Sequence, residues 1–326
     1  MKAILELIVW LCKAIEFELD IFSIIKNNRP KFDKIWLKED FGEVLRATRK
    51  AHKKCQKLLA MEFCFWLFTC IIGPFSTFYF SEVFPKNSLI FAAIFPVLIF
   101  LSCVHFCRAE VFFGDYKEIF KQNFINQIVK DINPNFSYRH AKINITNSGV
   151  YRYDYTMKED FISGEYKGVK FELAEFCKDN TYTSLKGAIF MCEFYKDFKF
   201  NLKIENKKIK LFHNGEILDN VEFNDIFTVS ATDKIETRYL LSLSFMERLT
   251  QIAKNPNFGI VSSAFSENKF YVFMENGKDL FEPYILYTPD FDLAKYYKSE
   301  ILALLCIIDE LNLTLNIYPK NRKFNH

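Results

Sequence analysis

Acidic and basic side chains gather in one C-terminal stretch of the 326-residue chain, where Asp233, Glu236, Arg238 and Arg248 lie within sixteen residues. Two carboxylates this close could carry out acid–base catalysis if their environments separated their pKa values. Arg238 lies two residues beyond Glu236, so on a helix the two side chains face apart. Helix capping and surface ion pairs account for the group most simply. Glu236, Arg238 and Arg248 remain candidates for contact with a partner.

Other patterns that could support chemistry are weak. Ser266-Glu-Asn-Lys269 has the Ser-x-x-Lys spacing of some nucleophilic serines, but it lies between two predicted strands and indicates a hairpin turn. The nine cysteines include no Cys-x-x-Cys pair, and in Cys103-Val-His-Phe-Cys107 the histidine points away from the face that both cysteines share. Zinc-protease, nucleophile-elbow, phosphate-loop and dinucleotide motifs are absent. We therefore predict no catalytic, cofactor-binding or metal-binding residue, and we expect a binding protein rather than an enzyme.

Two apolar runs without charge dominate the N-terminal half of the chain. Phe63–Phe80 and Leu89–Phe106 contain 18 residues each, and Ser81–Ser88 separates them. Runs of this length meet the criterion for transmembrane helices. The sequence therefore predicts a two-span transmembrane helical hairpin over residues 58–107. The alternative is a pair of buried core helices in a soluble protein.

A basic run before the first predicted span sets the expected orientation. Residues 44–57 carry six Lys or Arg residues and no acidic one, whereas the loop between the runs has Lys86 opposed by Glu82. The positive-inside bias then places both termini in the cytoplasm and predicts a multi-pass protein of the bacterial inner membrane. Attraction to anionic lipid headgroups is a second role open to the basic run. Nucleic-acid binding is not expected, because the net charge of the chain is only +3.

The changes in pattern divide the chain into four predicted parts. Residues 1–57 form amphipathic and basic N-terminal helices, and residues 58–107 form the hairpin. Residues 108–135 form a cytoplasmic stalk helix, and residues 136–326 form a cytoplasmic α+β domain. Met1–Ile25 has a wide apolar face, which fits a helix lying in the membrane interface and a helix docked on the soluble domain equally well.

The C-terminal part has the pattern of an antiparallel sheet with flanking helices, so the predicted fold class is α+β. Ile189–Cys192 and Phe270–Met274 are apolar on both faces, which favours central strands. Two capping boxes predict helices that begin at Asp233 and Ser244, and a last helix is expected near Phe291–Leu311. The predicted strands are Phe161–Glu165, Val169–Phe176, Gly187–Tyr195, Phe198–Ile204, Phe258–Phe265 and Lys269–Glu275.

A series of short motifs runs through the C-terminal half in a fixed order. They are Gly164–Phe171 with Glu175, Leu185–Phe190, Ile226–Ser230, Asp233–Leu241, Ser244–Leu249 and Asp279–Glu282. Over about Tyr151–Glu282 the chain resembles a bacterial family known only as domain of unknown function 3137. The resemblance implies a membrane-anchored protein with two spans before this domain, and no known activity. It also implies a LemA-type membrane protein as a partner, because the two are often encoded side by side.

Taken together, these patterns predict an inner-membrane-anchored protein whose cytoplasmic module binds or scaffolds a protein or lipid partner without catalysis. The alternative is a small-ligand-binding protein or an enzyme of unrecognised type in the α+β domain. A deep polar pocket would favour the alternative, whereas a flat or grooved apolar patch would favour the binding module. The expected partners are the lipid bilayer and a membrane protein, and the oligomeric state stays open.

Overall fold

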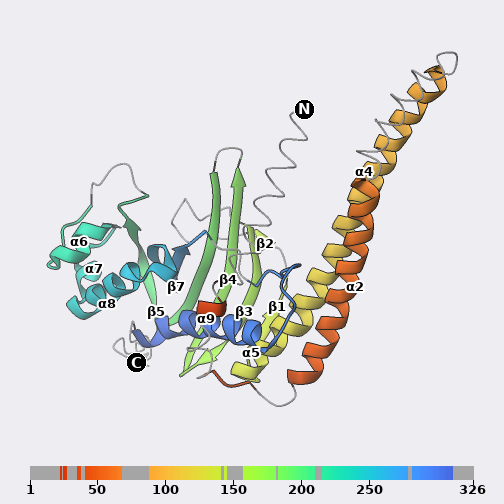
Figure 1. Ribbon diagram of the computed structural model, residues 1–326. Coiled ribbons are helices and arrows are strands. Elements are labelled where there is room, and N and C mark those ends of the chain that lie inside the picture. Colours follow the sequence, from red (N-terminus) through yellow and green to blue (C-terminus); the bar gives the residue numbers. More distant parts are fainter. Residues whose placement is uncertain are drawn as a thin grey trace, which may run out of the picture. The chain divides into compact units, whose positions relative to one another are not determined.

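The computed structural model describes residues 23, 25–27, 35–37, 41–67, 88–140, 143–144, 157–180, 183–209, 215–277 and 281–310. The chain divides into two compact units. We call Met1–Phe124 with Pro283–Lys295 the helical unit, and Ile125–Glu282 with Tyr296–His326 the sheet unit. Figure 1 labels their helices and strands.

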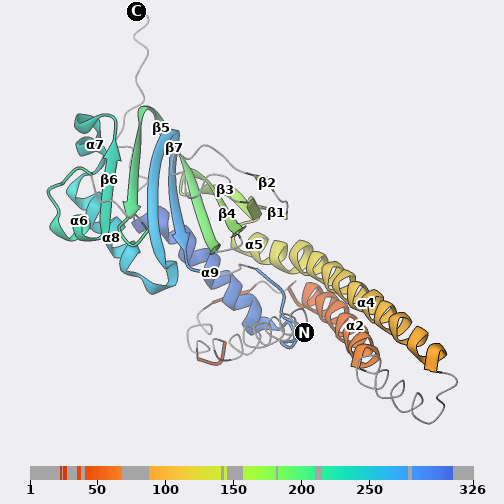
Figure 2. The same ribbon diagram turned by 90° about the horizontal axis from the view of Figure 1, so that it is seen from above.

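Two long helices form the centre of the helical unit. They are α2 (Phe41–Leu67) and α4 (Ser88–Ile119), which continues into a π-helical segment, η3 (Phe120–Ile125). The two helices lie side by side and run antiparallel (Figures 1 and 2). One face of α2 is buried at helical spacing, through Phe41, Leu45, Thr48, His52 and Cys55. This spacing places an apolar stripe along one side of the helix, which explains how α2 packs.

The predicted transmembrane hairpin is wrong. Among the helices of the described residues, none has both the length and the apolar character needed to cross a membrane. The fold class is α+β, but without the two-span hairpin over residues 58–107. The predicted localisation as a multi-pass inner-membrane protein with both termini in the cytoplasm is wrong for the same reason.

Charged residues in the same helices, and their polar contacts, explain this error. The prediction counted residues without charge, whereas helices α2 and α4 join those runs to charged segments. Of the predicted span Phe63–Phe80, the structure describes only Phe63–Leu67, as part of α2. Glu62 pairs with His105, which lies inside the second predicted span, and with Arg108 at 3.6 Å.

The sheet unit contains seven described strands in one antiparallel sheet. The strands are β1 (Ser137–Arg139), β2 (Ile143–Asn144), β3 (Met157–Tyr166), β4 (Val169–Asn180), β5 (Thr183–Asn206), β6 (Phe227–Ala231) and β7 (Ile260–Glu275). Their order is β1-β3-β4-β5-β6, with β2 paired to β3 and β7 paired to β5. Lys167 and Gly168 connect β3 to β4, and both have positive φ (50° and 83°), as a two-residue hairpin turn requires.

Strand β5 organises the sheet. Its first half pairs with β4 and β7, and its second half pairs with β6 and β7. Gly187 permits the close approach to β7, because an added Cβ would lie 2.0 Å from the carbonyl oxygen of Met274. The four strands predicted over residues 187–204 and 258–275 are therefore two long strands. Ile189–Cys192 is central as predicted, whereas Phe270–Met274 is buried but pairs only with β5 among the described strands.

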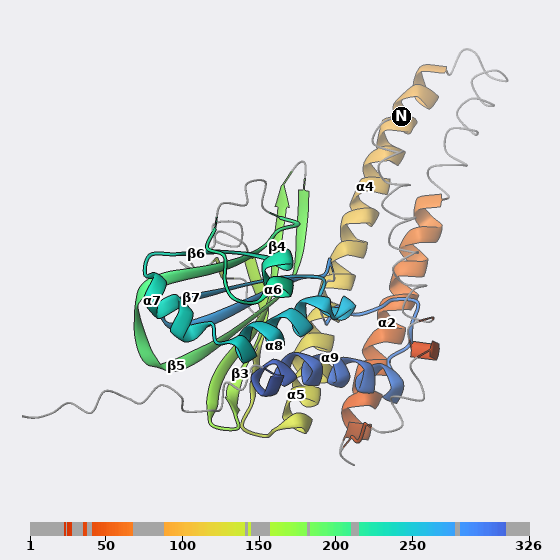
Figure 3. The ribbon, with the colours of Figure 1, turned by 90° about the vertical axis from the view of Figure 1, so that its left-hand side faces the viewer.

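The helices that pack on the sheet come from several parts of the sequence. In the sheet unit these are α5 (Asn126–Ile132), α6 (Val221–Ile226), α7 (Lys234–Leu240), α8 (Leu243–Lys254), the short η4 (Pro256–Phe258) and most of α9 (Phe291–Glu310). Phe245 of α8 packs against Phe265 and Phe270 of β7, with ring centroids 5.8 Å apart in each pair. Figures 1 and 3 show α6, α7 and α8 close together at one end of the sheet.

The predicted helix starts were correct in one case and wrong in the other. Asp233 caps α7, since its Oδ1 accepts hydrogen bonds from the backbone N–H groups of Ile235 (2.9 Å) and Glu236 (3.0 Å). Ser244 was predicted to cap the next helix, but the cap is Ser242, whose Oγ accepts from the N–H of Phe245 at 3.4 Å. The predicted N-terminal helix over residues 1–25 lies almost entirely outside the described residues.

His52 is a buried histidine that helps to hold α2 in the helical unit. Its Nε2 lies 2.9 Å from the carbonyl oxygen of Ile285, so Nε2 carries the proton and donates it. Nδ1 is buried and has no hydrogen-bond partner among the described residues. Arg49 and Gln56 bind the same loop, donating to the carbonyl oxygens of Pro289 and Ile285 at 2.6 Å each.

The buried position of His52 predicts a loss of stability in acid. Desolvation lowers the pKa of His52 below its ordinary value of 6.5, against a smaller opposite effect of the backbone carbonyls. The unfolded chain therefore binds this proton at a higher pH than the folded chain does. The stabilisation is fully present above about pH 6.5 and is lost as the pH falls below it.

We expect His52→Gln to flatten the pH dependence of the unfolding midpoint between about pH 7 and 5. Glutamine can still donate to Ile285 but takes up no proton. Thermal unfolding of both chains over this range, in buffers of constant ionic strength, measures the difference. Parallel curves for the two chains would show that His52 does not titrate on unfolding.

Candidate functional site

The charged group that the sequence predicted lies on helices α7 and α8. Asp233 is occupied as the cap of α7, so its carboxylate stabilises the helix. Glu236 and Arg248 are half-buried, whereas Arg238 is exposed on α7. The group therefore has one member with a structural role and one, Arg238, that is accessible to a partner.

Large apolar side chains are exposed around this group, which the sequence patterns did not predict. Ile235 and Tyr239 lie one turn apart on α7 and are 86% and 59% exposed. Others in the same segment are also more than half exposed. We call Ile217, Val221, Ile235, Tyr239 and Leu243 the α6–α7 surface.

Polar contacts hold the segment that carries the α6–α7 surface. Asn220 caps α6 by accepting from the N–H of Phe223 at 2.9 Å. Asn224 donates to the carbonyl oxygen of Leu218 at 2.6 Å and accepts from its N–H at 3.1 Å. Lys234 of α7 pairs with Glu216 at 3.5 Å, which ties the chain before α6 to the first turn of α7. The exposed side chains therefore project from a connected backbone.

Apolar packing beneath this segment fixes it further. Phe223 of α6 is fully buried and its ring lies 4.9 Å from that of Phe227. Leu249 and Ile252 of α8 are buried, on the side of the helix opposite its polar residues. Thr237 and Leu240 are buried on α7, so each of the three helices has buried side chains that are not members of the α6–α7 surface.

A second feature is a buried carboxylate at an irregularity of β3. Asp160 and Phe161 together oppose one residue of β4, because Glu159 pairs with Glu175 and Ile162 with Leu173. This is a β-bulge, a feature frequent next to functional sites. Asp160 has φ +57° and is fully buried. Asp tolerates this left-handed conformation better than most residues, although glycine is the usual choice.

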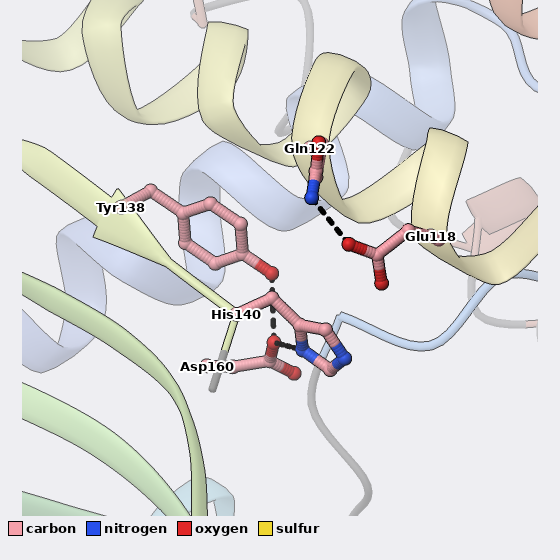
Figure 4. A network of polar contacts seen from close by, with 5 residues as sticks. All are labelled: Glu118, Gln122, Tyr138, His140 and Asp160. Carbon is pink, nitrogen blue, oxygen red and sulfur yellow. Dashed lines mark hydrogen bonds and ion pairs between the residues drawn. The ribbon is translucent and has the colours of Figure 1, made fainter. Parts of the chain in front are cut away.

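The carboxylate of Asp160 joins Tyr138 of β1 and His140, the residue that follows this strand. Its Oδ1 accepts from the hydroxyl of Tyr138 at 2.7 Å and lies 2.8 Å from Nδ1 of His140 (Figure 4). A carboxylate in this position fixes the tautomer and orientation of an imidazole. Since β1 makes only three residue pairs with β3, this contact also holds β1 and the residue that follows it. We assign the cluster a structural role.

Two of the cysteines, Cys55 and Cys192, and the serine of the Ser-x-x-Lys pattern lie in buried, structural positions. Burial raises the pKa of Cys55 to about 11, with a further contribution from Asp115, and burial also raises the pKa of Cys192. Their thiolates are therefore scarce at neutral pH. Ser266 lies inside β7, so the predicted turn is wrong, and its hydroxyl donates to Asn201 at 3.1 Å. The described residues include no group of three or more His, Cys, Asp or Glu side chains placed to hold a metal ion.

The sequence patterns predicted neither feature. Ile235 and Tyr239 read as ordinary apolar positions of a helix, and only the packing of α7 shows that they face outward. The register of β3 against β4 identifies the bulge at Asp160. The sequence of α7 did contain one signal of exposure. Its apolar residues alternate with charged ones, so no face of the helix is clearly apolar.

Comparison with protein families supports the predicted recognition. Residues 183–313 match the family described as protein of unknown function (DUF3137), so the resemblance to domain of unknown function 3137 is confirmed. The matched segment contains β5 and β7 and the whole α6–α7 surface, but not Tyr138, His140 and Asp160. No curated protein and no solved structure matches the chain.

Proposed function

We propose that the sheet unit is a protein-binding module and that the α6–α7 surface is its docking site. The observation that supports this is the group of five large apolar side chains, each more than half exposed, on a segment held by its own polar and apolar contacts. Exposed apolar groups within a polar rim mark protein interaction sites. Tyrosine and arginine, present as Tyr239 and Arg238, are the residues that most often carry binding energy.

The charge of this segment indicates the partner that would fit. Residues 216–254 contain seven acidic and four basic residues, a net charge of −3, whereas the whole chain has +3. A partner that presents an apolar face with a basic rim is complementary to such a surface. Glu236, Arg238 and Arg248 would then contact the partner at the rim. The LemA-type protein implied by the family resemblance is the first partner to test.

We expect the double substitution Ile235→Ser and Tyr239→Ser to weaken binding of the partner at least thirtyfold, since central aromatic contacts contribute about 2 kcal/mol or more. Stability should change by no more than about 0.5 kcal/mol, because both side chains are exposed. Calorimetry measures the binding, by titration of a purified partner, first the LemA-type protein, into each chain. Thermal unfolding of each chain measures the stability.

Val111→Ser with Leu286→Ser is the matched control. These residues are exposed to a similar degree, at 60% and 50%, and lie in the helical unit. This control should bind as the unsubstituted chain does. Equal weakening by the two double variants, or no weakening by Ile235→Ser and Tyr239→Ser, would remove the α6–α7 surface as the docking site.

A further inference from the structure

Helix α2 carries a stripe of cations on one exposed face. Its members are Arg46, Lys50, Lys53, Lys54 and Lys57, all exposed. At 100° per residue they fall within an arc of about 100°, and the stripe is about 16 Å long. We call these five residues the cationic stripe.

The stripe is not needed to pack the helix. The buried side of α2 consists of Phe41, Leu45, Thr48, His52 and Cys55, and the contacts to the loop before α9 come from Arg49, His52 and Gln56. Like charges three or four residues apart destabilise a helix. Packing and helix stability therefore give no reason for these five cations to share a face.

Acidic residues neutralise little of the stripe. Arg46 pairs with Glu43 at 3.8 Å, and both side chains are highly exposed. Lys50, Lys53, Lys54 and Lys57 make no ion pair with the described residues. The stripe thus presents a local excess of positive charge to its surroundings, and an anionic partner would be attracted to it.

Exposed apolar side chains adjoin the stripe further along the same pair of helices. Met61 continues the stripe's face and is 59% exposed, and Phe63 is half-exposed. On α4 the exposed side chains Val97, Phe100, Leu101 and Val104 recur at the spacing of one helix face. Arg108 of α4 contacts Glu62 at 3.6 Å and the two helices run antiparallel, so the part of α4 that precedes Arg108 lies beyond the stripe, in the direction of Met61 and Phe63.

From this order of charges and apolar groups we propose that the helical unit binds an anionic phospholipid surface through the cationic stripe. Lysines beside an anionic surface attract its headgroups, and adjoining Met and Phe side chains can enter the boundary between headgroups and acyl chains. Nucleic-acid phosphates would be attracted to the lysines but leave the apolar side chains exposed to water. Contact through these side chains requires no helix that crosses the lipid layer, and the proposal is independent of the α6–α7 surface.

Flotation of the full chain with vesicles tests this proposal. The chain is expected to float with vesicles of phosphatidylcholine and phosphatidylglycerol, much less with phosphatidylcholine alone, and less as salt is raised. Lys50→Gln with Lys53→Gln should lower the partition coefficient between vesicles and buffer about 25-fold, because each lysine contributes about fivefold. The matched control, Lys170→Gln with Lys208→Gln, neutralises two exposed lysines of the sheet unit and should leave it unchanged.

Two further experiments distinguish binding to lipid from binding to other anionic molecules. Met61→Ser with Phe63→Ser should reduce vesicle binding at high salt, where the electrostatic part is screened. Single-stranded DNA and polyglutamate should bind more weakly than the anionic vesicles at the same salt. Equal binding to both vesicle types, no effect of the lysine substitutions, or tighter binding of DNA or polyglutamate would overturn the proposal.

Discussion

Replacing Asp160 by alanine is expected to destabilise the sheet unit by about 2–5 kcal/mol, since each buried polar group that loses its hydrogen-bond partner costs about 1–3 kcal/mol. The carboxylate is fully buried and accepts from Tyr138 while it pairs with His140. Alanine would remove both contacts and leave the tyrosine hydroxyl and the imidazole without this acceptor. It would also have to adopt φ +57°, which costs a residue with a Cβ roughly 1 kcal/mol.

A series at this position separates the two effects. Asp160→Asn keeps an acceptor oxygen and tolerates the left-handed conformation, so it should be the least damaging change. Asp160→Gly removes the hydrogen bonds but relieves the backbone, so it should fall between asparagine and alanine. Thermal unfolding of the three variants measures the order, at roughly 2–4 °C for each kcal/mol. A glycine variant as stable as the unsubstituted chain would show that Asp160 has no structural role.

Replacing Lys298 by methionine is expected to destabilise the sheet unit by a similar amount, about 3–5 kcal/mol. Lys298 of α9 forms an ion pair with Asp131 of α5, and their side chains are only 12% and 1% exposed. Methionine fills much of the same volume, so packing is largely kept. The loss arises because the carboxylate of Asp131 stays buried without this counter-charge.

The double variant Asp131→Leu with Lys298→Met tests this origin of the loss. Removing both charges leaves no uncompensated carboxylate, so the double variant should recover most of the stability lost by Lys298→Met alone. Unfolding of the two single variants and the double variant gives the interaction energy as a double-mutant cycle. Additive losses would show that the pair itself does not account for the effect.

The elements that could be read from sequence were those with a strong local pattern. The cap at Asp233 predicted α7, and the apolar run after Phe291 predicted α9, because both depend on neighbouring residues. Strands β5 and β7 were each predicted as two, since polar residues such as Ser266 inside a strand resemble a turn. Their continuity depends on pairing with a strand about 70 residues away, which no local pattern contains.

The two apolar runs also show that a local pattern does not contain the contacts between distant residues. Counting residues without charge does not reveal that Glu62, just before the first run, meets His105 inside the second. For the candidate site, the sequence shows which residue types are present but not which side chains are exposed. Sequence pointed to the charge of Arg238, whereas the outward position of Ile235 and Tyr239 depends on which side of α7 packs.

Site-specific photocrosslinking from position 239 tests the proposed function most directly. A photoreactive phenylalanine would replace Tyr239 in the full chain, and the same residue would replace Val111 of α4 as the control. We expect one discrete adduct with a protein partner from position 239, lost when Ile235→Asp is added, and no such adduct from position 111. An adduct that survives Ile235→Asp, or equal adducts from both positions, would contradict a protein-binding role for the α6–α7 surface.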